Sequence, residues 1–266
     1  MKSKLSLHPF WDTDASLSLL LVTLVLVTFV IHPFLPTDGA GRVLLDLGMT
    51  LVLVFGSGTL LSSPALGKIL LASMVFAVST QWLIYVYDHK ELEVANQAAT
   101  LVFLLAMVLG LSARVYRQGE VGGHRLQGAV ALYLLLGYVW TFAYALLLHA
   151  DPTAIQRASG ESVRGAVVVA EAPATEGAMQ GPEPSKGLPI GDLNHFSFVT
   201  LTTLGYGDIL PVSQAARSLA ALEALIGQLF LAIVVARLVA LQITQPPPPT
   251  PGEGDGDGQP TPVSPG

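Results

Sequence analysis

Long apolar stretches recur along the chain and limit what it can fold into. They occupy residues 15–31, 43–61, 65–87, 94–113, 126–149 and 216–243. A helix needs about 20 predominantly apolar residues to cross a ~30 Å hydrocarbon core. Charged residues make up only 12% of the 266 residues, against about 25% in soluble domains, so an ordinary soluble surface is excluded. We predict an all-α membrane protein with six transmembrane helices, one for each stretch.

The charge balance and the cysteine count exclude other classes of protein. The net charge is -6, with 13 Lys and Arg against 19 Asp and Glu, whereas a nucleic-acid partner would call for clustered basic residues. The absence of cysteine excludes disulfides, thiolate metal sites and cysteine nucleophiles. The sequence shows no nucleophile–base pair and no metal-ligand spacing. We therefore expect neither an enzyme nor a resident cofactor.

The first apolar stretch follows Lys2 and Lys4 and resembles a signal peptide. Its 17 residues exceed the usual apolar region of about 7–15 residues, and no small-residue cleavage site follows. We interpret residues 15–31 as an uncleaved first helix. Residues 1–14 then form a short N-terminal segment.

Basic residues in the short loops predict the orientation, because Lys and Arg near helix ends favour the cytoplasmic side. With the N-terminus in the cytoplasm, the cytoplasmic segments hold Lys2, Lys4, Lys68, Arg114, Arg117 and Arg125. The opposite short loops hold Arg42 and Lys90. Both termini are therefore expected in the cytoplasm, and residues 15–125 form a four-helix membrane domain. Residues 150–191 become an extracellular turret, rich in Gly, Pro, Ala and Glu, in which residues 166–170 suggest a short strand.

A segment before the last apolar stretch is too short to cross a bilayer. About ten residues of helical character follow Asp192 and end at Gly205 and Gly207. Irregular backbone at membrane depth is tolerated only where it is buried in protein or lines water. A re-entrant pore helix and loop at residues 192–208, with Asp192 as the helix cap, satisfies this condition.

We call the following hexapeptide the signature segment: Thr203-Leu204-Gly205-Tyr206-Gly207-Asp208. It resembles the signature of potassium channels, in which Thr-Val-Gly-Tyr-Gly-Asp is the commonest form, and differs from it at one position. The resemblance extends over a pore domain at residues 126–245, with an outer helix at 126–149 and an inner helix at 216–243. These match the two-helix pore module of bacterial and two-pore-domain channels. The resemblance implies a homotetramer in the plasma membrane, the inner membrane of a bacterium, that conducts potassium ions passively.

The resemblance also assigns roles to the signature segment. Backbone carbonyl oxygens and one threonine hydroxyl would replace the hydration shell of K⁺. The residues of this filter are Thr203, Leu204, Gly205, Tyr206 and Gly207, and the carbonyls of the first four would bind the ion. Glycine at the third and fifth positions permits the alternating backbone handedness that points successive carbonyls the same way. Asp208 would lie at the filter mouth, with Thr202 as a supporting residue.

The inner helix contributes further candidate residues. Glu223 is its one deep ionisable residue, and a carboxylate within a membrane is costly enough to suggest a function. We expect Glu223 either to hydrogen-bond behind the pore helix and support the filter, or to lie near the outer interface within reach of water. Gly227 would either allow the helix to bend or pack closely against the pore helix. Four residues recur on one helix face and would line the cavity: Gln228, Ala232, Val235 and Val239.

Gating residues of familiar channels are missing from the sequence. Residues 94–113, the fourth apolar stretch, contain no Lys or Arg, whereas a voltage sensor carries arginines along this helix. We therefore predict a channel that is not steeply voltage-gated. Val199 stands where some bacterial channels carry a glutamate that pairs with the filter aspartate, so we expect Asp208 to lack that partner. His195 and its neighbour replace a tryptophan pair found in many members.

The C-terminal residues 246–266 are rich in Pro and Gly and carry acidic residues. This composition predicts a disordered cytoplasmic tail, whose run of prolines could bind a partner but need not. A non-conducting, channel-like membrane sensor or scaffold is the alternative to a conducting channel.

Overall fold

The computed structural model describes residues 15–34, 39–60, 66–87, 89–115, 123–158 and 188–243. These residues are mostly helical, and they include one pair of short strands. The predicted N-terminal segment at 1–14 and the predicted tail at 246–266 lie outside the described residues. The strand expected at 166–170 lies outside them as well.

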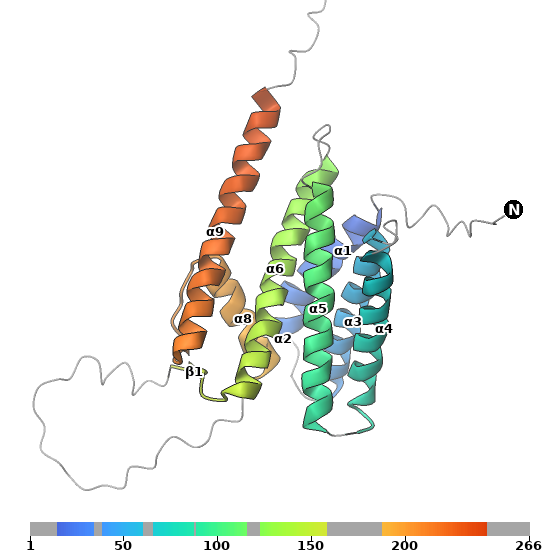
Figure 1. Ribbon diagram of the computed structural model, residues 1–266, viewed down its shortest axis with the longest axis vertical. Coiled ribbons are helices and arrows are strands. Elements are labelled where there is room, and N and C mark those ends of the chain that lie inside the picture. Colours follow the sequence, from blue (N-terminus) through green and yellow to red (C-terminus); the bar gives the residue numbers. More distant parts are fainter. Residues whose placement is uncertain are drawn as a thin grey trace, which may run out of the picture.

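The first part of the chain forms four helical segments (Figure 1). The first comprises α1 (Ala15–Val25), a π-helix η2 (Leu26–Ile31) and α2 (His32–Phe34). The others are α3 (Gly39–Leu60), α4 (Leu66–Leu83) and α5 (Lys90–Val115). Their positions correspond to the first four apolar stretches.

The first helical segment extends beyond the predicted stretch 15–31, because α2 continues it to Phe34. Pro33 lies inside α2. Proline has no N–H to donate and its ring crowds the carbonyl four residues earlier. The π-helix directly before α2 has wider turns and a different hydrogen-bonding register, which is one way in which a helix accommodates such a disturbance.

Four helices are long and apolar enough to cross a membrane: Gly39–Gly58, Lys90–Ala113, Leu126–Ala150 and Gln214–Arg237. The first and third predicted spans correspond to the shorter apolar helices Ser16–Ile31 and Leu70–Leu83. Length and composition thus support four crossings in the described part of the chain. Six crossings remain a prediction.

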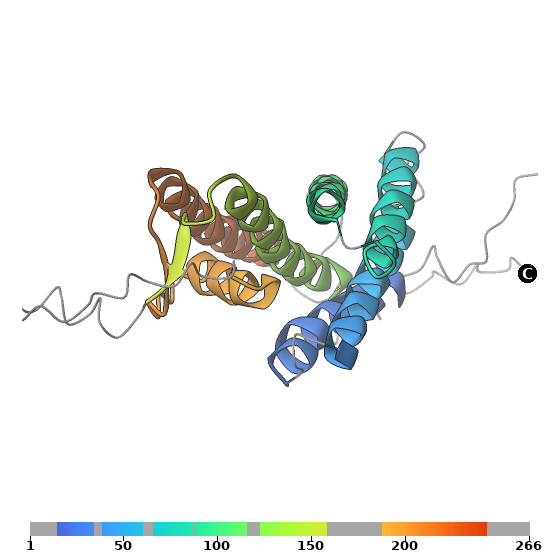
Figure 2. The same cartoon turned by 90° about the horizontal axis from the view of Figure 1, so that it is seen from below.

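The second part of the chain holds α6 (Gly123–Ala150), β1 (Ile155–Arg157), α8 (Ile190–Leu201), β2 (Ile209–Pro211) and α9 (Gln214–Ile243). The short α8 contacts both α6 and α9, and it lies beside them in both ribbon views (Figures 1 and 2). β1 pairs with β2 in antiparallel register, with Ile155 opposite Pro211. The all-α prediction is therefore corrected to mostly helical. Neither strand has a strong sequence pattern that would predict it, and each is a strand because it pairs with the other.

Two clusters of buried apolar side chains hold the fold together. One joins α1, α3, α4, α5 and α6, and the other joins α6, α8, α9 and the two strands. The fully buried Leu135 and Tyr144, both of α6, belong to the first and second cluster respectively. Helix α6 is therefore the wall that the two parts of the chain share, and it positions α8 relative to the first four helical segments.

Candidate functional site

The start of α8 differs from the prediction that Asp192 caps it. The N-cap residue is Pro189, and Asp192 lies one turn further on. The Asp192 carboxylate instead accepts hydrogen bonds from Arg157 of β1, through Nε at 2.9 Å and through Nη2. An acidic side chain in the first turn is still favourable beside the helix N-terminus. The aspartate thus ties β1 to α8.

The signature segment leaves α8 with an unusual backbone. Thr203, Gly205 and Gly207 have φ values of 58°, 60° and 75°, so left-handed residues occur at alternate positions. The two glycines adopt this conformation without a Cβ penalty. Thr203 is the one non-glycine residue with positive φ in the described part of the chain. Such strain costs about 1–2 kcal/mol and persists where the surrounding structure imposes it, often at functional sites.

Hydrogen bonds to the end of α8 hold the first residues of the signature segment. The Thr203 amide donates to the Thr200 carbonyl at 2.9 Å, and the Leu204 amide donates to the Val199 carbonyl at 2.9 Å. The last turn of a helix has carbonyls without helical partners. The signature segment supplies those partners, and its own start is thereby fixed to the helix.

Side chains from two elements meet at the base of the signature segment. Gln228 of α9 donates from Nε2 to Thr203 Oγ1 at 3.1 Å. Thr202 Oγ1 donates to the Phe198 carbonyl of α8 at 2.6 Å. The structure therefore brings the predicted cavity residue Gln228 to the predicted ion-binding residue Thr203.

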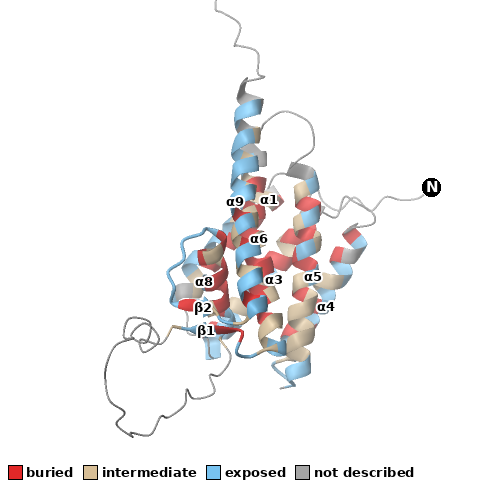
Figure 3. Ribbon diagram, turned by 60° about the vertical axis from the view of Figure 1, so that its left-hand side comes forward, coloured by how far each residue is buried: buried red, intermediate tan, exposed pale blue. Residues whose placement is uncertain are grey.

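The side of the signature segment that faces away from α8 is open to solvent in the single chain. Leu204 and Tyr206 are 56% and 67% exposed. The other predicted cavity residues lie exposed along α9, whose surface is pale blue over much of its length (Figure 3); they are Ala232, Val235 and Val239. One chain therefore presents these residues without enclosing a cavity around them.

Glu223 lies behind α8, with no exposed surface. Tyr144 of α6 donates its hydroxyl hydrogen to Glu223 Oε2 at 2.6 Å. Ser197 Oγ of α8 lies 2.6 Å from Glu223 Oε1 and 2.8 Å from the Gly137 carbonyl. Of the two expected positions for this carboxyl group, the structure shows the one behind the pore helix and not the one reached by water. That Glu223 supports the filter remains a prediction.

Close packing between α8 and α9 explains Gly227. A Cβ atom at this position would overlap the carbonyl oxygen of Leu201, the last residue of α8. The structure therefore shows the close-packing role that the sequence left as one of two alternatives. The contact brings the backbone of α9 directly against the end of α8.

Asp208 has a partner that sequence reasoning missed. His195 Nε2 lies 3.0 Å from Asp208 Oδ2, and the His195 ring stacks on the Tyr206 ring with centroids 6.0 Å apart. The amide of Ala158, next to β1, donates to the Asp208 carbonyl at 2.8 Å. The pair forms because the signature segment turns back alongside α8.

Three further residues of the site were not predicted: Tyr144, Ser197 and Arg157. Tyr144 and Ser197 are polar groups in apolar segments, which marks them as candidate partners for an intramembrane carboxylate. They lie 79 and 26 residues from Glu223 in sequence, so no local spacing could have paired them with it.

Comparison with known proteins identifies the class. Residues 167–242 match a family model described as "Ion channel", and this range includes α8, the signature segment and nearly all of α9. The match is consistent with the potassium channel family that the signature segment resembles. No curated protein and no solved structure matches the chain. The chain thus carries an ion channel domain, and with its long apolar helices this indicates a membrane protein and argues against an enzyme.

Proposed function

We propose that the protein is a potassium-selective ion channel in which the signature segment is the selectivity filter. The observation that carries this proposal is the left-handed backbone at Thr203, Gly205 and Gly207. Alternating handedness turns successive carbonyls toward one side. A column of such oxygens can replace the hydration shell of K⁺, and Thr203 adds a hydroxyl oxygen at its base.

The functional unit is a homotetramer, because one chain supplies one strand of an ion cage that needs several. The exposed side chains of Leu204 and Tyr206 and the exposed apolar residues of α9 support this assembly, since they lack cover in a single chain. In the tetramer, the exposed face of α9 with Ala232, Val235 and Val239 lines a central cavity below the filter. Conduction is passive and driven by the potassium gradient.

Six crossings of a plasma membrane would place both termini on the same side, and the basic residues of the short loops favour the cytoplasmic side. Gating by voltage is not expected to be steep, because residues 94–113 of α5 contain no Lys or Arg. Arg42 and Lys90 lie at the N-terminal ends of α3 and α5, close to the polar end of each helix and not along its apolar body. Charges on α5 therefore do not sense the membrane voltage, and a different stimulus opens the pore.

Flux from liposomes tests the proposal. Purified full-length chain is reconstituted into vesicles that hold either potassium or sodium, and the release of each ion is followed under an imposed gradient. We expect potassium to leave at least about tenfold faster than sodium, as a filter built of carbonyl oxygens requires. Equal rates for the two ions would contradict the potassium filter.

A protein that folds, assembles and conducts neither ion under varied pH, voltage and tension would favour the alternative of a non-conducting sensor or scaffold. Liposomes of the same lipid composition that contain no protein supply the background rate in that experiment.

A further inference from the structure

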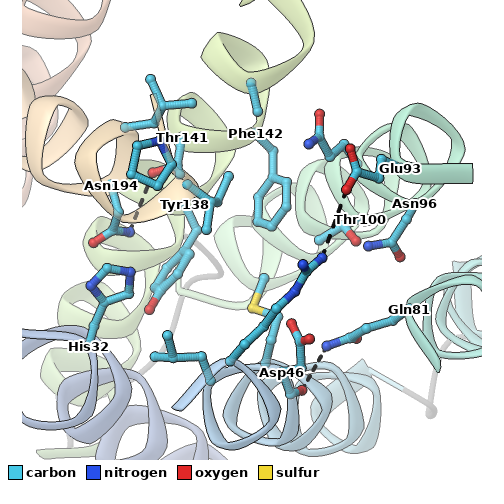
Figure 4. Close-up of a pocket in the computed structure, with 18 of the residues that line it drawn as sticks. His32, Asp46, Gln81, Glu93, Asn96, Thr100, Tyr138, Thr141, Phe142 and Asn194 are labelled. Carbon is cyan, nitrogen blue, oxygen red and sulfur yellow. Dashed lines mark hydrogen bonds and ion pairs between the residues drawn. The ribbon is translucent and has the colours of Figure 1, made fainter. Parts of the chain in front are cut away.

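A cavity of about 530 Å³ lies between the first four helical segments and the N-terminal half of α8. Figure 4 shows the side chains that line it, with α3, α4 and α5 forming one wall. Helices α6 and α8 form the opposite wall. The volume falls within the range of about 300–1,000 Å³ that is usual for small-molecule sites. The cavity is separate from the signature segment, none of whose residues lines it.

The wall from α3 and α5 carries an excess of negative charge. It holds two carboxylates, Asp46 and Glu93, and one guanidinium, Arg42, which gives a net charge of -1. Arg42 Nη2 lies 3.8 Å from Glu93 Oε1. In the described part of the chain, no cationic side chain lies within 4.0 Å of the Asp46 carboxylate. Asp46 therefore forms no ion pair at that distance, and the nearby Arg42 guanidinium lies 5.9 Å from the centroid of the Tyr85 ring.

The neighbours of Asp46 fix the carboxylate in place without neutralising it. Tyr85, in the turn after α4, donates its hydroxyl hydrogen to Asp46 Oδ2 at 2.5 Å. A tyrosine hydroxyl keeps its proton near pH 7, so Tyr85 is a neutral donor to the carboxylate. Gln81 donates from Nε2 to the Asp46 carbonyl at 2.8 Å, as the dashed line in Figure 4 shows.

One buried polar atom at the cavity lacks a hydrogen-bond partner. Gln97 of α5 lines the cavity, and its Oε1 atom is buried without a hydrogen-bond donor. An unpaired buried acceptor costs about 1–3 kcal/mol. A ligand or water that brings an N–H or O–H group to this atom would remove that cost. The Asp46 carboxylate accepts one hydrogen bond from Tyr85 and has the capacity to accept more.

The opposite wall is built differently. Its hydroxyl groups already have protein partners: the Tyr138 hydroxyl lies 2.9 Å from Thr28 Oγ1, and Thr141 Oγ1 donates to the Gly137 carbonyl at 2.8 Å. The remaining lining of this wall is largely apolar and includes Phe142, Leu148, Leu188 and Leu193. The cavity therefore joins a wall with a net negative charge to a largely apolar wall.

We propose that this cavity binds an amphipathic organic cation, with its ammonium group at Asp46 and Glu93 and its apolar body against Phe142, Leu148 and Leu193. An inorganic cation would leave the apolar wall unused. An organic anion would be repelled by the net negative charge of the wall from α3 and α5.

The position of the cavity would allow a bound ligand to affect the pore through α8. Leu193 and Asn194 line it and belong to α8, two turns before the signature segment. Asn194 is buried and donates from Nδ2 to Thr141 Oγ1 at 3.4 Å. A ligand that fills the cavity touches the same helix that holds the filter, so binding would change conduction. This second step rests on the proposed function, whereas binding itself does not.

Binding is tested by cysteine protection, which suits this chain because it contains no cysteine. Leu148→Cys places one thiol on the apolar wall of the full-length protein. The rate of maleimide labelling is measured with three probes of the same shape: 4-phenylbutylamine, 4-phenylbutanol and 4-phenylbutyrate. We expect the amine to protect the thiol at concentrations about tenfold lower than the alcohol, and the carboxylate to protect least.

Charge variants assign the effect to the acidic wall. Asp46→Asn, made in the Leu148→Cys background, should raise the amine concentration for half protection about tenfold and leave protection by the alcohol unchanged. Glu91→Gln is the matched control, because Glu91 is exposed on α5 and does not line the cavity. Glu93→Gln serves as a second test if Asp46→Asn alters the labelling rate without a probe. Equal protection by the three probes, or protection by none, would overturn the proposal.

Potassium flux distinguishes binding of the ligand in the cavity from an effect of the bound ligand on conduction. We expect 4-phenylbutylamine to change flux at least about twofold in the parent and not in Asp46→Asn; block of the pore itself would persist in that variant. Protection of the thiol without a change in flux would overturn the coupling to the pore and support the binding site alone. Absence of flux without any probe would contradict the proposed function and leave the protection result standing.

Discussion

The two sides of α8 differ in how much of their surroundings one chain supplies. On the rear side, Glu223 has no exposed surface and its two oxygen atoms lie 2.6 Å from Tyr144 and Ser197. On the front side, Leu204 and Tyr206 of the signature segment are more than half exposed. The rear is complete within the protomer, whereas the front lacks cover.

This difference shows that a single chain supplies the support behind the signature segment but not the surroundings of its front side. A buried carboxyl group is stable only when hydrogen bonds satisfy it, and α6, α8 and α9 provide these within one chain. Backbone carbonyls that bind an ion, in contrast, must come from several strands around an axis. Substitutions on the two sides should therefore have separable effects, on folding at the rear and on ion selectivity at the front.

The largest effect is expected for Gly205→Ala on the front side. A Cβ at φ +60° costs about 1–2 kcal/mol in each chain, so the segment is expected to leave the alternating conformation and lose potassium selectivity. Comparison of potassium and sodium flux from liposomes measures this loss. Gly39→Ala is the matched control, because Gly39 lies at the start of α3 with φ +55° and has no atom within 4 Å of the place where a Cβ would lie. A selective Gly205→Ala channel would show that the alternating backbone is not required.

A large loss of stability is expected for Glu223→Ala on the rear side. The substitution leaves the hydroxyl of Tyr144 without its acceptor and opens a cavity beside Ser197, which should lower the free energy of unfolding by about 2–4 kcal/mol. Chemical denaturation of the purified chain measures the change. Glu223→Gln keeps the shape and one carbonyl oxygen, so it should lose less than half as much. Equal stability of the parent and Glu223→Ala would remove the distinction between the two sides.

A smaller loss is expected for Gly227→Ala, where α9 meets the end of α8. The added methyl group would overlap the Leu201 carbonyl, so one helix must shift, at a cost of about 1–3 kcal/mol. The same denaturation experiment measures it. Ala232→Gly, at an exposed position of the same helix, shows the cost of backbone propensity alone, about 1 kcal/mol. If Gly227→Ala changed channel opening without changing stability, bending and not close packing would explain the glycine.

The smallest effect is expected at the exposed pair of His195 and Asp208. The side chains are 44% and 54% exposed, and the histidine is charged only when it is protonated. Asp208→Asn removes the negative charge of the pair, so the mouth should attract fewer cations. Flux at low salt should fall by less than about threefold, because the pair is exposed to solvent. His195→Gln keeps the charge of Asp208 and is the matched control, and an equal fall in both variants would show that charge is not the cause.

Local sequence patterns were sufficient for the apolar helices and for the conformation of the signature segment. Apolar runs of the length of α3, α5, α6 and α9 have few alternatives in a membrane. Gly205 and Gly207 mark the left-handed positions because they lack a Cβ atom. The cap of α8 was predicted wrongly, because Asp192 has an alternative partner in Arg157 that lies 35 residues away in sequence.

Local sequence patterns could not predict the contacts between segments that are distant in sequence. The sequence by itself determined the apolar helices, the short α8 and the backbone handedness at Gly205 and Gly207, since each depends on neighbouring residues. The tertiary structure alone decided that Tyr144 and Ser197 satisfy Glu223, that β1 pairs with β2, and that Gly227 admits the end of α8. Hydrogen bonds and close packing of this kind depend on where α6, α8 and α9 meet in space, which no spacing along one helix specifies.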